Sequence, residues 1–341
     1  MPLRPRVHIA PPDATTWRRS YPDGLGASAF ASPAFQRLML HDQPGDWVLR
    51  ALSVDGSEAW LPVLGRCDRY GRWILRAHPV GYDLLPVPLT RLDQAELDHW
   101  IHALCTPRIQ HFVWWLPSWH TAGLQLKPHR TLTGEVEVEH HVTYTIPFGG
   151  EVQAHMREHV STTMRRYARR NAERGVTVSS DPTPAQIEAY IEIYERSFRD
   201  NAWEGEMFDR AFFYAVAREL GRGGTLAVVL HEGVVVGGGV LMLDPAVIHY
   251  FQGAIDRDAK KVYPHVALYT HALELAAQQG IGWVNLGGVN EGNTGLEWFK
   301  SAWGAHATAS PMLVFTSGLR KTIESVQRRL PAWLPRRLRP R

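Results

Sequence analysis

The strongest charge pattern in this chain lies between residues 157 and 174, where six arginines and two glutamates give a local net charge of +4. On one helix, guanidinium groups at this spacing can bind phosphate. A solvated helix face whose arginines find carboxylate partners elsewhere accounts for the same pattern. The sequence leaves both interpretations open. The arginines are Arg157, Arg165, Arg166, Arg169, Arg170 and Arg174.

A second basic cluster occupies residues 318–341. This tail contains eight lysines and arginines and one acidic residue, Glu324, so its net charge is +7. Because the whole chain has a net charge of +3, the rest of the chain has a net charge of −4. Leu330 and Trp333 lie among the arginines. A basic amphipathic segment of this kind can lie on an anionic membrane surface or contact nucleic acid phosphates, and a solvated chain end has the same composition.

Neither the cysteines nor the histidines form a metal or redox pattern. Cys67 and Cys105 are far apart and are the only cysteines, so we expect no disulfide framework and no zinc site. None of the 17 histidines belongs to a His-Glu-x-x-His motif. His140 and His141 are neighbours on an alternating strand, so their rings point to opposite faces. No metal is expected.

Length and composition predict a globular protein of about two domains, with 341 residues, 45% hydrophobic and 21% charged. The longest apolar run, 234–243, is shorter than the roughly 20 residues that span a bilayer. Residues 1–13 lack the apolar run of about 7–15 residues that an export signal needs. We therefore expect a cytoplasmic protein, with the basic tail as its possible contact to the inner face of the membrane.

Three consecutive strands are predicted in the second half, because β-branched and apolar runs are separated there by short turns. A helix then begins at Pro264, a favoured first-turn residue, and ends before Gly280. The expected order is strands 225–230, 234–243 and 247–255, helix 264–279, strand 283–286 and helix 296–303. Before these elements we expect helix 151–174, strand 176–179 and helices 183–201 and 207–220.

The first half repeats this order of elements. Its expected elements are helix 31–41, strands 47–54, 58–66 and 72–76, helix 93–105 and strands 111–115 and 135–147. The sequence therefore predicts an α/β (α+β) fold of tandem domains, each with a mixed, mostly antiparallel sheet flanked by helices. The expected domains are 1–145, 146–317 and the tail 318–341.

Four motifs in a set order resemble the FemAB-related branch of the Gcn5-related N-acetyltransferase (GNAT) superfamily. They are Arg-Arg-Tyr-Ala-Arg-Arg-Asn-Ala-Glu-Arg-Gly-Val at 165–176, Tyr-Glu-Arg-Ser-Phe at 194–198, Tyr-Phe-Gln-Gly at 250–253 and Gly-Leu-Glu-Trp-Phe-Lys at 295–300. The resemblance is strongest over residues 143–315. The first half is similar in element order alone, as expected of a degenerate first copy.

The resemblance implies an N-acyltransferase that moves an acyl group from an acyl thioester, expected to be acyl-CoA, to an amine. The acceptor is expected to be a small molecule, an amino sugar or a cell-envelope precursor. The donor alternatives are an acyl carrier protein and, as in FemAB-type peptidyltransferases, aminoacyl-tRNA, which would make tRNA a partner. A non-catalytic binding member of the fold is a third possibility.

The resemblance places the donor where strands 247–255 and 283–286 diverge. A base must take the amine proton, and Glu195, Glu204 and Tyr250 are the catalytic candidates, although solvated glutamates and a core tyrosine are their ordinary roles. A backbone N–H near Gln252, Gly253 and Ala254 is expected to hold the oxyanion.

The turn before helix 264–279 lacks the glycines with which most GNAT enzymes cradle the pyrophosphate of coenzyme A. The FemAB-related branch shares this feature, so the donor stays open. Donor contacts are therefore expected from the side chains of Arg257, Lys260, Lys261 and Tyr263.

Lys300 is the main substrate-binding candidate, because the resemblance places the lysine of a Phe-Lys pair against the substrate. A lysine beside an apolar helix face can also extend to water. The other residues expected to bind substrate are Phe299, Asn285, Gly288, Arg165 and Arg166.

Overall fold

The structure is a computed structural model that describes residues 5–11, 30, 33–41, 46–77, 92–116, 124–200, 207–259, 262–289 and 292–322. The chain folds as two compact units. Unit 1 takes its described residues from 1–20, 39–141 and 310–341, and unit 2 takes them from 21–38 and 142–309. Each unit is described separately below.

Unit 2 is built on a mixed sheet in the order β7-β12-β11-β10-β9-β8. All neighbouring pairs that are described are antiparallel except β11 with β12. A parallel pair needs a crossover, and α8 (Pro264–Gln279) supplies it. The strands are β7 (Gly134–Pro147, in unit 2 from residue 142), β8 (Thr177–Ser179), β9 (Gly224–His231), β10 (Val234–Leu243), β11 (Val247–Ile255) and β12 (Trp283–Gly288).

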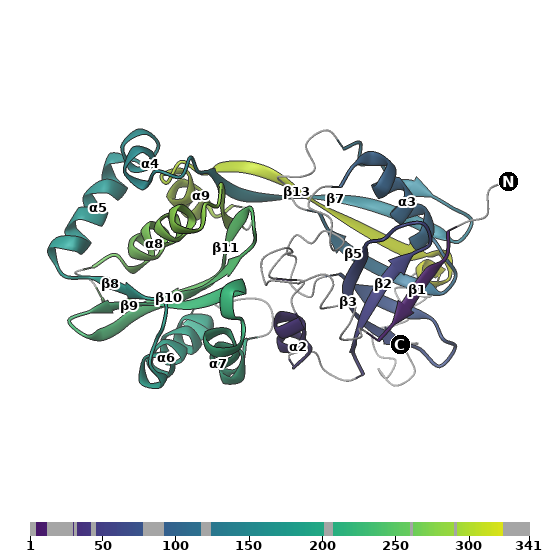
Figure 1. The fold of residues 1–341 in the computed structure, drawn as a ribbon, viewed down its shortest axis with the longest axis horizontal. Helices are drawn as coiled ribbons and strands as arrows, with labels where there is room; N and C mark the ends of the chain where they lie inside the picture. Colours follow the sequence, from purple (N-terminus) through teal and green to yellow (C-terminus); the bar gives the residue numbers. More distant parts are fainter. Residues whose placement is uncertain are drawn as a thin grey trace. The chain divides into compact units, whose positions relative to one another are not determined.

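Helices cover both faces of this sheet, with α5 and α8 on one face and α6 and α7 on the other (Figure 1). Helix α8 has Pro264 in its first turn and ends at Gly280, whose φ of 67° closes the helix in the left-handed conformation. The remaining elements are α4 (Val152–Glu158), α5 (Thr162–Glu173), α6 (Pro184–Asp200), α7 (Arg210–Glu219), the 3-10 turn η2 (Gly221–Gly223) and α9 (Thr294–Ser301).

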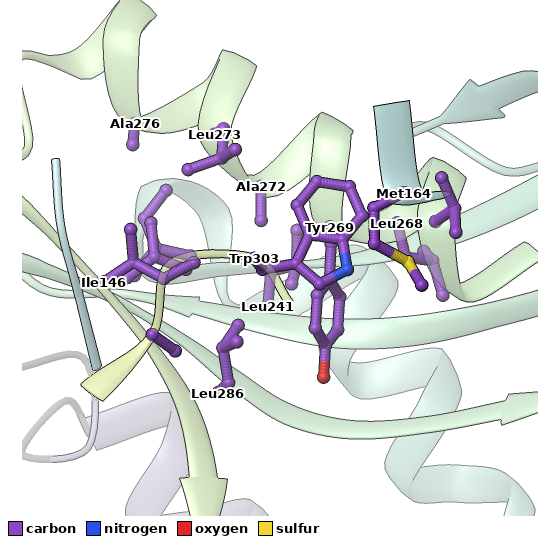
Figure 2. Packing of buried hydrophobic residues seen from close by; sticks show 14 of the residues in the cluster. Ile146, Met164, Leu241, Leu268, Tyr269, Ala272, Leu273, Ala276, Leu286 and Trp303 are labelled. Carbon is purple, nitrogen blue, oxygen red and sulfur yellow. The ribbon is translucent and has the colours of Figure 1, made fainter. Parts of the chain in front are cut away.

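The core of unit 2 lies between α8 and the sheet, around Trp303 (Figure 2). Trp303 is fully buried, and its ring lies 5.5 Å from that of Tyr269 in an edge-to-face arrangement. One face of α8 supplies the apolar surface because its buried residues recur every three or four positions. They include Leu268, Tyr269, Ala272, Leu273 and Ala276.

Glycines in the middle of the sheet let aromatic side chains lie directly on the backbone. A Cβ on Gly238 would lie 2.6 Å from Cδ2 of Tyr190, which reaches the sheet from α6. A Cβ on Gly253 would overlap the hydroxyl group of Tyr250. Gly238 therefore determines how closely Tyr190 of α6 approaches β10.

Unit 1 repeats the β-β-β-α-β order with a sheet in the order β1-β2-β3-β4-β5-β13. Its one described parallel pair, β4 with β5, is again joined by a segment that contains a helix, α3. The elements are β1 (Val7–Ala10), β2 (Val48–Val54), β3 (Trp60–Cys67), β4 (Trp73–Arg76), α3 (Gln94–Leu104), β5 (Ile109–Trp115), β6 (His129–Arg130) and β13 (His306–Ser317, in unit 1 from residue 310). Helix α2 (Pro33–His41) contributes residues to both units.

The predicted fold class, with mixed and mostly antiparallel sheets flanked by helices, is confirmed. Two details differ. The single helix predicted over 151–174 is wrong, because α4 ends at His159 and Ser161 starts α5 by accepting a hydrogen bond from the Met164 amide. The strand β13 was not predicted, and its pairing with β5 places residues 310–317 in unit 1. The units therefore differ from the contiguous segments 1–145 and 146–317.

In the part of the chain that the structure describes, no helix is long and apolar enough to cross a bilayer. Within the same residues, no group of three or more histidine, cysteine, aspartate or glutamate side chains could hold a metal ion. Cys67 is exposed and Cys105 is buried. Most of the basic tail, residues 323–341, lies outside the described residues.

We predict that Gly238→Ala lowers the free energy of unfolding by about 1–3 kcal/mol. The new methyl group would lie 2.6 Å from Cδ2 of Tyr190 and 2.8 Å from the carbonyl oxygen of Ala227, both too close for a normal contact. Chemical denaturation measures the change. Gly282→Ala is the matched control, since nothing lies within 4 Å of its Cβ position. Equal effects of the two substitutions would contradict the proposed packing.

Candidate functional site

The parallel pairing of β11 and β12 ends early. It comprises three residue pairs, of which His249 with Asn285 is the last, although β11 continues to Ile255 and β12 to Gly288. We call the parts of β11 and β12 that no longer pair with each other, residues 250–255 and 286–288, the strand opening. It lies where the diverging strands were expected to receive the donor.

Helix α9 places Lys300 at the strand opening. Its Nζ donates hydrogen bonds to the carbonyl oxygens of Gly287, at 2.9 Å, and Gly288, at 2.7 Å. The residue is 4% exposed, and Nζ lies 5.8 Å from the ring centroid of Tyr144. Lys300 therefore points inward to the end of β12 and does not extend to water.

The charge of Lys300 has no carboxylate partner among the residues that the structure describes. Its hydrogen-bond partners there are backbone carbonyls. Burial lowers the pKa of Lys300 to about 8, because the ammonium loses hydration that these carbonyls replace in part. At neutral pH the site therefore contains a mostly protonated, buried cation.

Asn285 holds the backbone that binds Lys300. Its Oδ1 accepts hydrogen bonds from the Thr143 hydroxyl at 2.6 Å and from the Gly287 amide at 2.8 Å. Its Nδ2 lies 3.4 Å from Nδ1 of His249. Asn285 and Thr143 are both buried. Asn285 thus links β7, β11 and β12 and fixes the turn whose carbonyls accept from Lys300.

His249 extends this polar network to the other end of β11. Its Nε2 lies 3.4 Å from Oδ2 of Asp244, and both residues are buried. Because the Asn285 amide nitrogen can only donate, the network assigns Nδ1 of His249 as the acceptor and places the proton on Nε2, facing Asp244. The Phe30 ring packs edge-on against the imidazole, 4.8 Å between centroids.

Of the three candidate bases, Tyr250 is the one that lies in the strand opening. Burial raises its pKa above the ordinary value, so the phenol is protonated at neutral pH and acts as a donor. Glu195 lies on α6 with its carboxylate 3.7 Å from the Arg210 guanidinium. Glu204 lies outside the described residues. The identity of the base stays a prediction.

The residues expected near the oxyanion occupy β11. The carboxamide Oε1 of Gln252 accepts a hydrogen bond of 2.6 Å from the Tyr190 hydroxyl. Gly253 lies beneath the Tyr250 hydroxyl, and Ala254 is buried. Burial raises the pKa of Tyr190 well above its ordinary value, so this hydroxyl also keeps its proton.

The glycine-free turn before α8 is held by α5. The Asn171 side chain accepts from the Tyr263 amide at 3.0 Å and donates to the Tyr263 carbonyl at 2.9 Å, and the rings of Tyr167 and Tyr263 stack at 3.8 Å. Arg257 is exposed. Lys260 and Lys261 lie outside the described residues.

The remaining expected site residues separate into two groups. Phe299 and Gly288 lie near Lys300, with the Phe299 ring 5.3 Å from that of Tyr269. Arg165 donates to the Arg157 carbonyl at 2.9 Å, so it holds the corner between α4 and α5. Arg166 is exposed, with its guanidinium 5.5 Å from the Tyr167 ring centroid.

Three residues at the site were not predicted to function there. Asn171 lies inside the arginine-rich motif but differs from its neighbours in being buried. Tyr190 lies on the buried face of α6, and no sequence signal marks its bond to Gln252. Thr143 shows no signal at all, because its partner Asn285 lies 142 residues away.

Comparison with known proteins identifies the fold. Residues 158–301 match the sequence model of the acetyltransferase (GNAT) domain. No curated protein sequence matches the chain. Among solved structures, FemX has a TM-score of 0.63 at 11% identity and covers 90% of this chain and 96% of its own.

Two further solved structures are also similar. The C-terminal domain of a putative lysylphosphatidylglycerol synthetase from Agrobacterium fabrum has a TM-score of 0.54 at 13% identity, covering 89% of this chain and 92% of its own. L-PGS from Bacillus licheniformis has a TM-score of 0.50 at 13% identity, covering 83% and 91%.

The chain is therefore a GNAT-fold transferase, and residues 158–301 form its GNAT domain. Its fold is that of the FemAB-related branch, as the four motifs predicted.

We predict that Lys300→Met raises the free energy of unfolding at pH 7, by up to about 3 kcal/mol, because the pKa depression to about 8 makes the buried ammonium costly. The folded state binds fewer protons than the unfolded state between pH 8 and 10.5, so wild type gains stability as pH rises through this window. Urea unfolding of both proteins at pH 7 and pH 10 measures the difference. A difference that does not shrink with rising pH would contradict a buried charge.

Proposed function

We propose that unit 2 transfers an acyl group from an acyl thioester, such as acyl-CoA, to the amine of an acceptor that also carries an anionic group. The observation that carries this proposal is Lys300, a buried cation at the strand opening whose hydrogen-bond partners among the described residues are backbone carbonyls. An anionic acceptor group would replace the hydration that the ammonium has lost.

The reaction needs orientation and charge stabilisation. The neutral amine attacks the carbonyl carbon, a C–N bond forms, and the carbonyl π electrons move to oxygen. When the intermediate collapses, the C–S bond breaks and the thiolate leaves with its electron pair. The proton that the amine loses passes to a base or solvent and then neutralises the thiolate, so protons balance.

The donor phosphates would meet the N-terminal end of α8. No side chain caps this helix, and Pro264 has no amide proton. The Tyr263 amide already donates to Asn171. The first turn therefore offers the amides of His265 and Val266, fewer than a glycine-rich turn provides, which supports a role for side chains such as Arg257 in binding the donor.

A second candidate is transfer of an aminoacyl group from tRNA. It is favoured by the similarity to FemX and to two proteins named for synthesis of lysylphosphatidylglycerol, a lipid with an aminoacyl group. It is also favoured by α5, whose Arg166, Arg170 and Arg174 are exposed along one side of the helix at intervals of four. The acyl donor would then be an ester, and the same carbonyl chemistry would apply.

The ammonium of Lys300 predicts the pH dependence of acceptor use. With a pKa of about 8 in the free enzyme, kcat/KM for an anionic amine acceptor falls as pH rises through 8, because the charge that binds the anion is lost. Lys300→Arg keeps the charge, so the fall in kcat/KM above pH 8 disappears. Lys300→Met removes the charge and lowers kcat/KM at least tenfold at pH 7. Thiol release from acetyl-CoA with a panel of amino sugars and amino acids measures this. Lys127→Met, on an exposed lysine of unit 1, is the matched control. Equal activity of all variants would contradict an anion site at Lys300.

Salt dependence tests the tRNA alternative. If the α5 arginines contact phosphates, the affinity for tRNA falls by about 10- to 1000-fold between 50 and 200 mM salt, because released counterions drive binding. Replacing Arg166, Arg170 and Arg174 together with glutamine would flatten this dependence. Filter binding with bulk tRNA measures both, and an affinity that is flat in salt would exclude this candidate.

A further inference from the structure

Two buried hydrogen-bond donors on β11 have no partner in the part of the chain that the structure describes. They are the hydroxyl of Tyr250 and the carboxamide nitrogen Nε2 of Gln252. Both belong to the strand opening, where β12 no longer pairs with β11. Buried polar groups almost always find a partner, so unpartnered donors in the strand opening indicate a ligand that accepts from them.

The orientation of Gln252 is fixed by Tyr190. The Tyr190 hydroxyl is fully buried and donates to Oε1 of Gln252 at 2.6 Å. With Oε1 facing a donor, the other end of the carboxamide, Nε2, presents its two N–H groups away from Tyr190.

Tyr250 presents its hydroxyl group beside Gly253. The phenol extends along β11 and lies so close to the Cα of Gly253 that a Cβ would overlap its oxygen. The ring packs edge-on against Tyr269 at 5.1 Å, which holds it in this position. The two unpartnered donors therefore come from positions 250 and 252 of one strand, where Tyr250 packs against Tyr269 of α8 and Gln252 contacts Tyr190 of α6.

We infer that Nε2 of Gln252 donates a hydrogen bond to the carbonyl oxygen of the acyl donor, with Tyr190 as a positioning residue and the Tyr250 hydroxyl as a second donor. This inference rests on the proposed function and deepens it. As the C–N bond forms, negative charge gathers on that oxygen, and fixed donors in a buried site stabilise it. No proton leaves Gln252 or Tyr250 in this step.

The experiment measures whether the protein senses an acyl carbonyl. Isothermal titration compares two pairs of probes, acetyl-CoA with CoA and 3′-alanylamino-3′-deoxyadenosine with 3′-amino-3′-deoxyadenosine. Wild type is expected to bind one carbonyl probe about three- to tenfold more tightly than its partner, the effect of one or two hydrogen bonds. Gln252→Leu abolishes the preference, and Gln252→Glu, which keeps the oxygen that faces Tyr190, reduces it as well.

The positioning role of Tyr190 needs a readout that a purely structural role would not change. In wild type the ¹³C resonance of the carbonyl in the bound probe is expected to move downfield, because a hydrogen bond polarises the C=O group. Tyr190→Phe shifts this resonance back towards its value in water, and Tyr250→Phe does so in part. Tyr214→Phe is the matched control, since it also removes a phenol hydrogen bond, 2.8 Å to Glu188, away from the strand opening.

The outcomes separate the two proposals. If wild type binds all four probes without preferring the carbonyl, or if Gln252→Leu and Gln252→Glu both keep the preference, the inference about Gln252 is wrong and the proposed function stands. If wild type binds none of the four, the donor classes of the proposed function are wrong, and the inference falls with them. A carbonyl resonance that is unchanged in folded Tyr190→Phe contradicts the positioning role.

Discussion

The short parallel pairing of β11 and β12 is the constraint on which this site depends. A strand that leaves its neighbour exposes backbone and side-chain polar groups that the ladder no longer satisfies, and each must find another partner. At this point Asn285 binds the Gly287 amide, the Gly287 and Gly288 carbonyls accept from Lys300, and Thr143 closes the network from β7. These hydrogen bonds therefore replace the ones that β11 and β12 would have made with each other if their pairing had continued.

The protonation states of these groups share one physical cause. Burial raises the pKa values of Tyr190, Tyr250 and Tyr269 and lowers that of Lys300, because each charged form loses hydration. The phenols are therefore neutral donors at neutral pH. A low-polarity environment that holds fixed donors stabilises negative charge that develops on a substrate more than bulk water does.

Close packing on glycine determines where these donors lie. Gly238 admits the Tyr190 ring from one face of the sheet, and Gly253 admits the Tyr250 hydroxyl. On the α8 side, the packing of Tyr269 against Trp303 and Phe299 holds the ring on which Tyr250 rests. The hydrophobic core of unit 2 and its polar site therefore share residues, which couples the stability of one to the geometry of the other.

The sequence by itself predicted most of the elements and their order, because alternation, helical periodicity, Pro264 and Gly280 act locally. The Phe-Lys pair also predicted a role for Lys300, and the position of Asn285 at the end of strand 283–286 predicted one for Asn285. The tertiary structure alone decided the side-chain partners. Thr143 meets Asn285 across 142 residues and Tyr190 meets Gln252 across 62, and neither contact leaves a periodic signal in the sequence. The break between α4 and α5 and the return of β13 to unit 1 likewise depend on capping and on strand pairing over long separations, which local propensity does not encode.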